Sequence, residues 1–346
     1  MARQYIRLMT LAVLAAGLAG LPYAHAQDSA PAAPAAENAK SGNVAPPAEN
    51  AGSVPPNYKS RIPQMPGDFP WPGDPRPYGD SRWASHIDRA LWFMLNDRAA
   101  ARWTHIAILD FLQRRFGLHE RYRAVNQLKP DLGVTITPVE QERYFRLTEP
   151  GFRFRGTIPE KLDTMDDFMT AALYCDVMPI PEDTIAQMIS KMNYVDSLPP
   201  KDRMGTFKMI ADYFYTHLAL SLQWLQEKGC VTDQAGANEL RERLIRAMEK
   251  LISQNGPDTD LGIECMAMLC YLRVPGRVKP AWVEKMVAAQ LPDGGWANAY
   301  DLKAPELVSN GHTTILALWV LLEQAVPKIN DVPWVARASE PAPPAP

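Results

Sequence analysis

The chain has 346 residues and a formal net charge of −3, with 36 Lys and Arg residues against 39 Asp and Glu residues. Because no basic block stands out, the composition argues against a nucleic-acid partner. Hydrophobic residues make up 47% of the chain, which is normal for a globular protein and allows one large core or two small ones.

The first 26 residues have the three parts of a secretory signal peptide. A start with two arginines is followed by the apolar run Leu8–Leu21, and Ala24–Ala26 fits the small-x-small pattern before a cleavage point at Gln27. The apolar run is short for a bilayer span, and a short N-terminal membrane anchor is the alternative. We expect a periplasmic or secreted protein with no membrane span in the mature chain.

Low-complexity segments flank the core. Residues 27–66 are rich in Ala and Pro and almost free of large apolar residues, and residues 336–346 are similar. Such segments bury too little apolar surface to repay the entropy of ordering them. We therefore expect a disordered linker at 27–66, a folded domain at 67–335 and a disordered tail at 336–346.

Helical spacing of apolar residues dominates the core, and Gly or Pro stands at nearly every junction between the periodic segments. The expected helices are Ser85–Asn96, Arg98–Phe116, Leu162–Met178, Pro181–Tyr194, Lys201–Lys228, Ala237–Gln254, Leu261–Leu272, Pro280–Gln290 and His312–Gln324. The exception is Gly133–Thr157, where VTIT and FRFRGTI alternate with period two and indicate a small β-hairpin insertion.

The expected helices repeat one another. The segment THIAI, Thr104–Ile108, resembles THLAL, Thr216–Leu220. In each case a glycine, Gly117 or Gly229, stands twelve residues after the His. Amphipathic helices alternate with helices that are apolar all round, as an outer and an inner ring would require. The pattern predicts an all-α fold, an α/α toroid of about five or six helical hairpins, with an open solenoid of helix pairs as the alternative.

A family resemblance supports the toroid. QLPDGGW at Gln290–Trp296 matches the QxxxGxW element of terpenoid cyclase repeats, which lies between an outer and an inner helix. The following GHTTILALWVLLE, Gly311–Glu323, resembles inner helices of terpenoid cyclases and protein prenyltransferases. The match is clearest over Ala281–Glu323 and weaker over Glu239–Leu272. The resemblance implies an α/α toroid whose lumen holds an apolar or mixed ligand, and it implies little about chemistry.

The acidic segment DTDL at Asp258–Leu261 resembles the DxDD motif of cyclases that protonate an alkene. Asp260 aligns with the proton donor, but Leu261 replaces the last Asp, which argues against that reaction. The alternative is structural, because Asp258, Thr259 or Asp260 can cap the helix that follows.

The cysteines leave several possibilities open. Four of them allow three pairings in an oxidising compartment. Cys265 and Cys270 lie about 140° apart around a helix, which suits neither a mutual bridge nor a shared metal site. We expect buried, unreactive thiols. Prenyltransferases of this fold hold zinc with Asp, Cys and His, for which Asp260, Cys265 and His312 are the nearest equivalents, but the spacing differs, so no metal and no cofactor are predicted.

Histidines supply the remaining candidates for a site. His105 and His217 occupy the same slot of the repeated helix, and His312 begins another helix. On an inner ring the three imidazoles would face one cavity as base, acid or ligands, whereas the alternative is histidines buried among helices and bonded to carbonyls. The candidate catalytic residues are Asp260, His217 and His312. The candidate ligand-binding residues are His105, Trp296 and Tyr300.

Three classes of function follow. The first is a toroid that binds a small lipid-like ligand. The second is a lyase or hydrolase acting on an envelope or exported glycan, in which Asn310 and His312 act with Tyr213, Tyr215 or Tyr300. Trp71, Trp83, Trp92, Trp103 and Trp224 suit sugar stacking, although core packing is the more common use of tryptophan. The third is a non-catalytic module that binds an envelope protein.

Overall fold

A computed structural model describes residues 58–71, 73–79, 81–97, 103–119, 142–198, 206–298 and 307–337. The chain divides into two units, residues 1–54 and 55–346, and every described residue belongs to the second. The expected signal peptide therefore lies outside the described residues, as do most of the expected linker and tail. Folded contacts begin before the expected boundary at Gly67, because the Lys59 backbone N–H donates to the Leu307 carbonyl and Ile62 is buried.

The described residues are mostly helical and contain no sheet; two isolated β-bridges are the only strand-like pairings among them. All nine helices expected from the sequence are present, with ends shifted by a few residues. They are α2 (Ala84–Asn96), α3 (Trp103–Phe116), α5 (Met165–Tyr174), α6 (Thr184–Ser197), α7 (Thr206–Lys228), α8 (Gln234–Asn255), α9 (Asp260–Tyr271), α10 (Pro280–Ala288) and α11 (Gly311–Ala325). The described residues also contain two 3-10 helices, η2 (Glu142–Leu147) and η3 (Pro275–Arg277).

The expected β-hairpin at Gly133–Thr157 falls partly outside the described residues, which begin again at residue 142. From there the chain forms η2 and then turns and extended segments that pair with no strand in the described part. Arg146 explains this course, because its guanidinium donates to Asp176 at 2.5 and 2.7 Å and to the Leu173 carbonyl at 2.6 Å. The segment is thus held against the end of α5.

Local sequence explains where the helices end. Gly117 and Gly229 follow α3 and α7 with φ of +67° and +70°, a left-handed conformation that glycine adopts without steric cost. The two repeated segments therefore finish in the same way, as their spacing predicted. At the start of α5, Thr164 and Asp167 form a reciprocal capping box.

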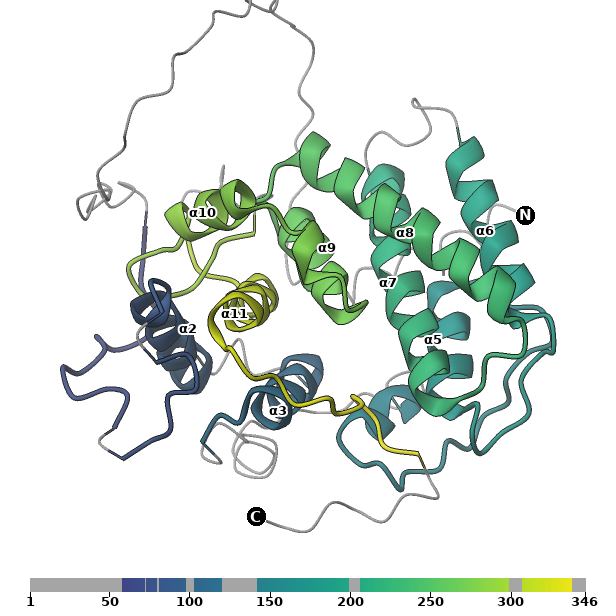
Figure 1. The fold of residues 1–346 in the computed structure, drawn as a ribbon, viewed down its shortest axis with the longest axis horizontal. Coiled ribbons are helices and arrows are strands. Elements are labelled where there is room, and N and C mark those ends of the chain that lie inside the picture. The colour runs from purple at the N-terminus through teal and green to yellow at the C-terminus, as the bar shows by residue number, and fades with distance from the viewer. Residues whose placement is uncertain are drawn as a thin grey trace, which may run out of the picture. The chain divides into compact units, whose positions relative to one another are not determined.

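The uniformly apolar helices lie inside the folded unit. Every residue of α9 is buried, and so is nearly all of α11, whereas α8 buries only one side. Helix α9 packs against α7, α8 and α11, and α11 packs against α2, α3, α9 and α10. Figure 1 shows α11, α9 and α7 in the interior, with α10, α8 and α6 following one another along the outer edge. Burial thus follows the alternation read from the sequence.

The QxxxGxW element forms the turn between α10 and α11 and ties it to α2. The side-chain Nε2 of Gln290 donates to the backbone carbonyls of His86 and Gly294. Its side-chain Oε1 accepts from the Arg89 guanidinium at 2.7 Å. A Cβ at Gly294, where φ is +89°, would lie 2.2 Å from the Arg89 carbonyl oxygen, so the close approach requires glycine. The Trp296 indole N–H donates to the Met286 carbonyl at 2.7 Å.

The cysteines correct one expectation. Cys175 and Cys230 form a disulfide between the ends of α5 and α7, which pack side by side. The expectation of free thiols was therefore wrong for this pair, because the pairing depends on how residues 55 apart in sequence pack together. It is confirmed for Cys265 and Cys270, which are buried and free, and burial raises the pKa of both thiols.

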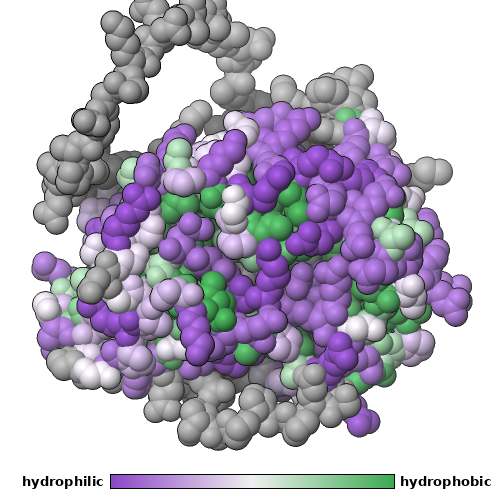
Figure 2. All heavy atoms as spheres, viewed as in Figure 1, coloured by the Kyte–Doolittle hydropathy of each residue, from purple (hydrophilic) through white to green (hydrophobic). Residues whose placement is uncertain are grey.

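The surface is polar for the most part. On the face shown in Figure 2, hydrophilic residues predominate, and hydrophobic residues are visible in small patches toward the middle. Among the described residues, only Val177 and Tyr194 are large hydrophobic residues that are well exposed. No helix in the described ranges combines the length and the apolar character that crossing a membrane requires.

Candidate functional site

Five ionisable side chains from four helices meet in the described part of the chain. We call them the imidazole–carboxylate cluster: His105 on α3, His217 on α7, Asp260 and Glu264 on α9, and His312 on α11. Asp260 and Glu264 are four residues apart, so they project from the same side of α9. Oxygen and nitrogen atoms of Asp260, Glu264 and His312 lie within 4.8 Å of one another, a group that could hold a metal ion.

Asp260 is the most heavily bonded member of the cluster. Its Oδ1 accepts from the Thr313 hydroxyl at 2.5 Å and faces His312 Nδ1 at 3.1 Å, and its Oδ2 accepts from the Tyr213 hydroxyl. Burial acts to raise the pKa of Asp260, but the His312 imidazole and the Thr313 and Tyr213 hydroxyls outweigh it and lower the pKa to about 2. Asp260 is therefore ionised at neutral pH, which is not the state that protonating an alkene requires.

Thr259 leaves the Asp260 side chain available for these contacts. The Thr259 hydroxyl accepts from the Gly262 backbone N–H at 3.1 Å and caps α9. Of the three residues that the sequence offered as caps, Thr259 takes that role. Asp260 becomes the first residue of the helix, and its carboxylate is directed toward α7 and α11 instead of toward its own backbone.

Glu264 is the member that sequence reasoning missed. Its Oε1 accepts from the Thr216 hydroxyl at 2.5 Å, and its Oε2 has no hydrogen-bond partner although the residue is only 6% exposed. His312 Nε2 lies 3.7 Å from Oε2, and His217 Nδ1 lies 3.8 Å from Oε1, both beyond hydrogen-bonding distance. A second acid one helical turn after Asp260, inside an otherwise apolar helix, was the available signal.

The structure brings together the three histidines that the sequence singled out. The rings of His105 and His312 are 6.0 Å apart between centroids, and His105 is buried. The side chains of His217 and His312 are 21% and 22% exposed. His217 Nδ1 lies 2.8 Å from the Tyr213 carbonyl oxygen, and a carbonyl can only accept, so Nδ1 carries the proton. In neutral His217 the basic nitrogen is therefore Nε2.

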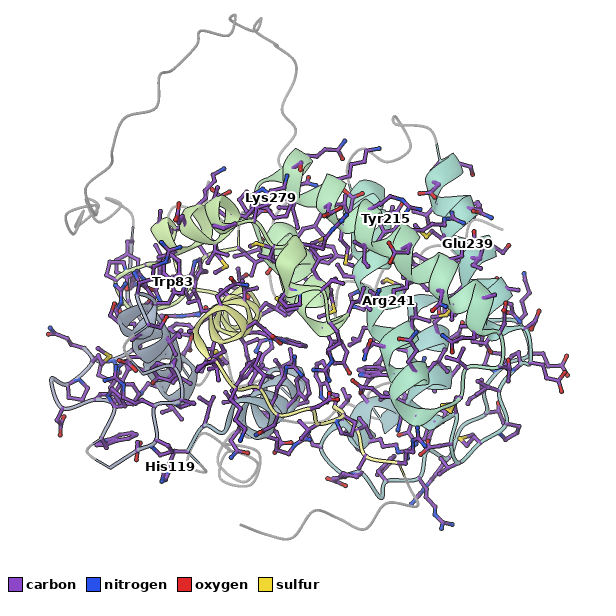
Figure 3. All side chains as sticks on the ribbon, in the orientation of Figure 1. Trp83, His119, Tyr215, Glu239, Arg241 and Lys279 are labelled. Atoms are coloured by element: carbon purple, nitrogen blue, oxygen red, sulfur yellow. A yellow bond between two sulfur atoms is a disulfide. The ribbon has the colours of Figure 1, made fainter. Side chains whose placement is uncertain are left out.

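The other candidate residues have structural contacts or fall outside the description. Trp296 is buried and holds the α10–α11 turn, and Tyr300 lies outside the described residues. Asn310 caps α11, its side-chain oxygen accepting from the backbone N–H groups of His312 and Thr313. The hydroxyl of Tyr215, labelled in Figure 3, donates to Asp196 on α6 at 2.6 Å.

The tryptophans proposed for sugar stacking divide between core and partly exposed positions. Trp83 and Trp224 are buried in the core, as the structural alternative expected. Trp71 and Trp92 are partly exposed and pack on Phe69, with ring centroids 5.0 and 5.2 Å away. The side chain of Trp103 lies outside the described residues.

Cys265 does not belong to the group that could hold a metal. Burial raises the pKa of its thiol, and the nearby Glu264 and Asp212 carboxylates add to the effect, so the thiolate that zinc requires is disfavoured. Where the prenyltransferase resemblance pointed to Asp, Cys and His, this chain brings together Asp260, Glu264 and His312.

A hollow lies between α6, α7 and α8, outside the cluster. Its lining is polar and carries both signs of charge, including Asp196, Asp212, Tyr215, Arg243 and Lys250. Arg243 is held by Asp196 at 3.2 Å, so part of the positive charge is already neutralised. The cluster has the stronger claim as a site because it is buried and incompletely bonded.

Comparisons with protein-family models, with curated proteins and with solved structures found no match. The resemblance to terpenoid cyclases and protein prenyltransferases accordingly depends on the motifs quoted above.

Proposed function

We propose that this chain is an exported protein whose helical unit is an α/α toroid, and that it binds a small apolar or mixed ligand at the imidazole–carboxylate cluster. In arrangement it would be similar to the terpenoid cyclases and protein prenyltransferases. The observation that carries the proposal is the meeting of three imidazoles and two carboxylates from four helices among the buried apolar residues of the core.

Bringing these ionisable groups together in the interior costs free energy. Moving a carboxylate out of water costs several kcal/mol unless partners replace the lost hydration. Asp260 has such partners, but Glu264 Oε2 accepts no hydrogen bond and has only His312 Nε2 nearby, at 3.7 Å, and apolar residues would fill the same space at lower cost. Incompletely bonded ionisable groups in a fold's interior are typical of functional sites.

The toroid is supported by the nesting of helices. The fully buried α9 and the almost fully buried α11 each follow a more exposed helix, α8 and α10, and the chain turns back between the members of each pair. Repeating this hairpin around a common centre would place the inner helices in a ring, with the cluster contributed by several of them.

Export is supported by two independent features. Residues 1–26 have the pattern of a cleavable signal peptide. The Cys175–Cys230 disulfide is of a kind that persists in oxidising compartments and is rare in the cytosol. A periplasmic or secreted location would satisfy both.

The surroundings of the cluster favour a ligand with both apolar and polar parts. Next to the ionisable groups, α9 and α11 present buried aliphatic and Met side chains, while His217 and His312 keep partial access to solvent. The glycan lyase alternative is less favoured, because the Asn310 side chain would have to abandon its cap and Tyr213 its bond to Asp260.

Native mass spectrometry of the purified full chain tests the proposal. We expect a stoichiometric adduct of a small molecule, with His217→Ala losing most of it and His119→Ala keeping it. His119 is a suitable control because it is partly exposed, 28% against 21% for His217, and lies outside the cluster. An adduct that survives His217→Ala, or a chain that carries no small molecule and none after exposure to a lipid extract, would refute ligand binding at the cluster.

A further inference from the structure

We infer that His312 and Glu264 hold a divalent transition-metal ion, Zn²⁺ by ligand chemistry, and that Asp260 positions the His312 ring for it. The inference deepens the proposed function and rests on it only in placing the ligand site at the same cluster. It names an inorganic partner for a position where the sequence predicted none.

The unpartnered oxygen of Glu264 is the first observation. Oε2 is buried and accepts no hydrogen bond, while Oε1 of the same carboxylate is occupied by the Thr216 hydroxyl. A buried carboxylate oxygen without a partner costs free energy that a bound cation would remove. Since Oε1 is fixed, Oε2 is the atom left to bind a ligand.

The distance between the two ligand atoms is the second observation. His312 Nε2 lies 3.7 Å from Glu264 Oε2, too far for a hydrogen bond. Two protein ligands that share a tetrahedral zinc at 2.0–2.2 Å stand about 3.4 Å apart. A shift of a few tenths of an ångström would therefore place both atoms on one ion.

The bond between His312 and Asp260 is the third observation. His312 Nδ1 faces Asp260 Oδ1 at 3.1 Å, which leaves Nε2 as the nitrogen directed at Glu264. Metal-binding histidines typically donate their other ring N–H to a carboxylate, which fixes the tautomer and the ring orientation. Both oxygens of Asp260 are already bonded, so we assign Asp260 as a positioning residue and not as a ligand.

The ligand types narrow the metal. Imidazole is a poor ligand for Mg²⁺ and Ca²⁺, and carboxylate is a poor one for Cu⁺, whereas the pair suits Zn²⁺ and its divalent neighbours. His217 stands beside Glu264 with a second imidazole, whose basic nitrogen is Nε2. Partial access to solvent at His217 and His312 would let an organic ligand reach the ion.

Zinc titration of the full chain, purified without a histidine tag and stripped with a chelator, tests the inference by calorimetry. We expect one saturable Zn²⁺ per chain and a higher melting temperature with zinc. Glu264→Gln should weaken binding by at least about tenfold, and Asp260→Asn by about 10 to 100-fold through loss of ring orientation. Glu227→Gln should bind like the natural chain, because Glu227 is a partly buried carboxylate whose Oε2 is already bonded to Tyr271 and Trp334.

Cobalt binding can be measured on the natural chain, so the result does not depend on whether a variant folds. Co²⁺ bound in place of zinc should give the intense visible bands of a four- or five-coordinate ion, whereas six-coordinate hydrated Co²⁺ absorbs weakly. The absence of a saturable site, or equal binding by Glu264→Gln and the natural chain, would overturn the inference. His312 would then pair with Asp260 and Glu264 with no ion between them.

The two proposals fail separately. A chain that retains an organic adduct in mass spectrometry but binds neither Zn²⁺ nor Co²⁺ would keep the proposed function and lose the metal. A chain that binds one Zn²⁺ through Glu264 but no organic molecule would keep the metal and lose the proposed ligand.

Discussion

Lys228, at the end of α7, is buried, and its ammonium group has no hydrogen-bond partner among the described residues to replace its lost hydration. Its side chain is 1% exposed, and its Nζ lies 3.6 Å from Asp176 Oδ1, beyond hydrogen-bonding distance. Arg146 already donates to both oxygens of Asp176. Burial, followed by repulsion from Arg146, outweighs the attraction of Asp176 and lowers the pKa of Lys228 from 10.5 to about 8.

The lowered pKa makes stability depend on pH. Between about pH 8 and 10.5 the unfolded chain holds a proton on Lys228 that the folded chain has lost, so stability rises with pH there. Below pH 8 the folded chain bears the full cost of the buried charge. We expect Lys228→Met to raise the free energy of unfolding at pH 7 by about 2 kcal/mol, with the gain shrinking as pH approaches 10.5.

Urea denaturation of both chains at pH 7 and pH 10 measures this difference. Lys250→Met is the matched control, because Lys250 is exposed and its removal should change stability by less than about 0.5 kcal/mol at either pH. A Lys228→Met chain that is less stable at pH 7 would show that the attraction of Asp176 dominates instead.

At the level of elements, one glutamine joins three segments that are distant in sequence. Gln290 connects the end of α10 to the backbone of α2 and to the turn that leads into α11. This turn also pairs through Trp296 with Asn310 in an isolated β-bridge at the start of α11. There the Asn310 side chain caps the helix that carries His312. The packing of α2 and the position of His312 therefore depend on the same motif.

Replacing Gln290 with Ala should lower the free energy of unfolding by about 2 kcal/mol, because several hydrogen bonds are lost and the His86 carbonyl and Arg89 lose a partner. Chemical denaturation at pH 7 would measure the loss. Gln254→Ala provides the control, since Gln254 lies in the last turn of α8 and is exposed. Equal losses in the two variants would mean that the Gln290 contacts contribute nothing.

For the molecule as a whole, the Cys175–Cys230 disulfide closes a long loop. It links residues 55 apart and fixes the end of α5 to the end of α7. A cross-link over such a distance restricts the unfolded chain and by loop-closure entropy contributes about 4 kcal/mol. Reduction of the disulfide would remove this contribution to stability.

We expect the double variant Cys175→Ala, Cys230→Ala to unfold at a markedly lower urea concentration than the natural chain. A reductant should lower the midpoint of the natural chain toward that of the variant and leave the variant unchanged, because Cys265 and Cys270 are already free. Coincident denaturation curves for the oxidised natural chain and the variant would rule out a stabilising cross-link.

The sequence by itself determined the helices and many of their ends. Periodicity, capping and the conformational preference of glycine act within a few residues, so the nine α-helices of the described residues and the glycines after α3 and α7 could be predicted. It also pointed to Asp260 through the DTDL segment, to His105 and His217 through the repeated THxA pattern, and to His312 at the start of another helix.

The tertiary structure alone decided what these residues meet. The choice of Thr259 as cap, the pairing of Cys175 with Cys230 and the inclusion of Glu264 beside His312 all follow from how helices pack. The disulfide and the Glu264–His312 contact join residues about fifty apart, and no local preference encodes which side chains face each other across two helices. The Thr259 cap is local, but Asp260 is not available for it because its carboxylate is bonded to Tyr213 and Thr313. Only packing of α9 against α7 and α11 turns scattered acids and imidazoles into one site.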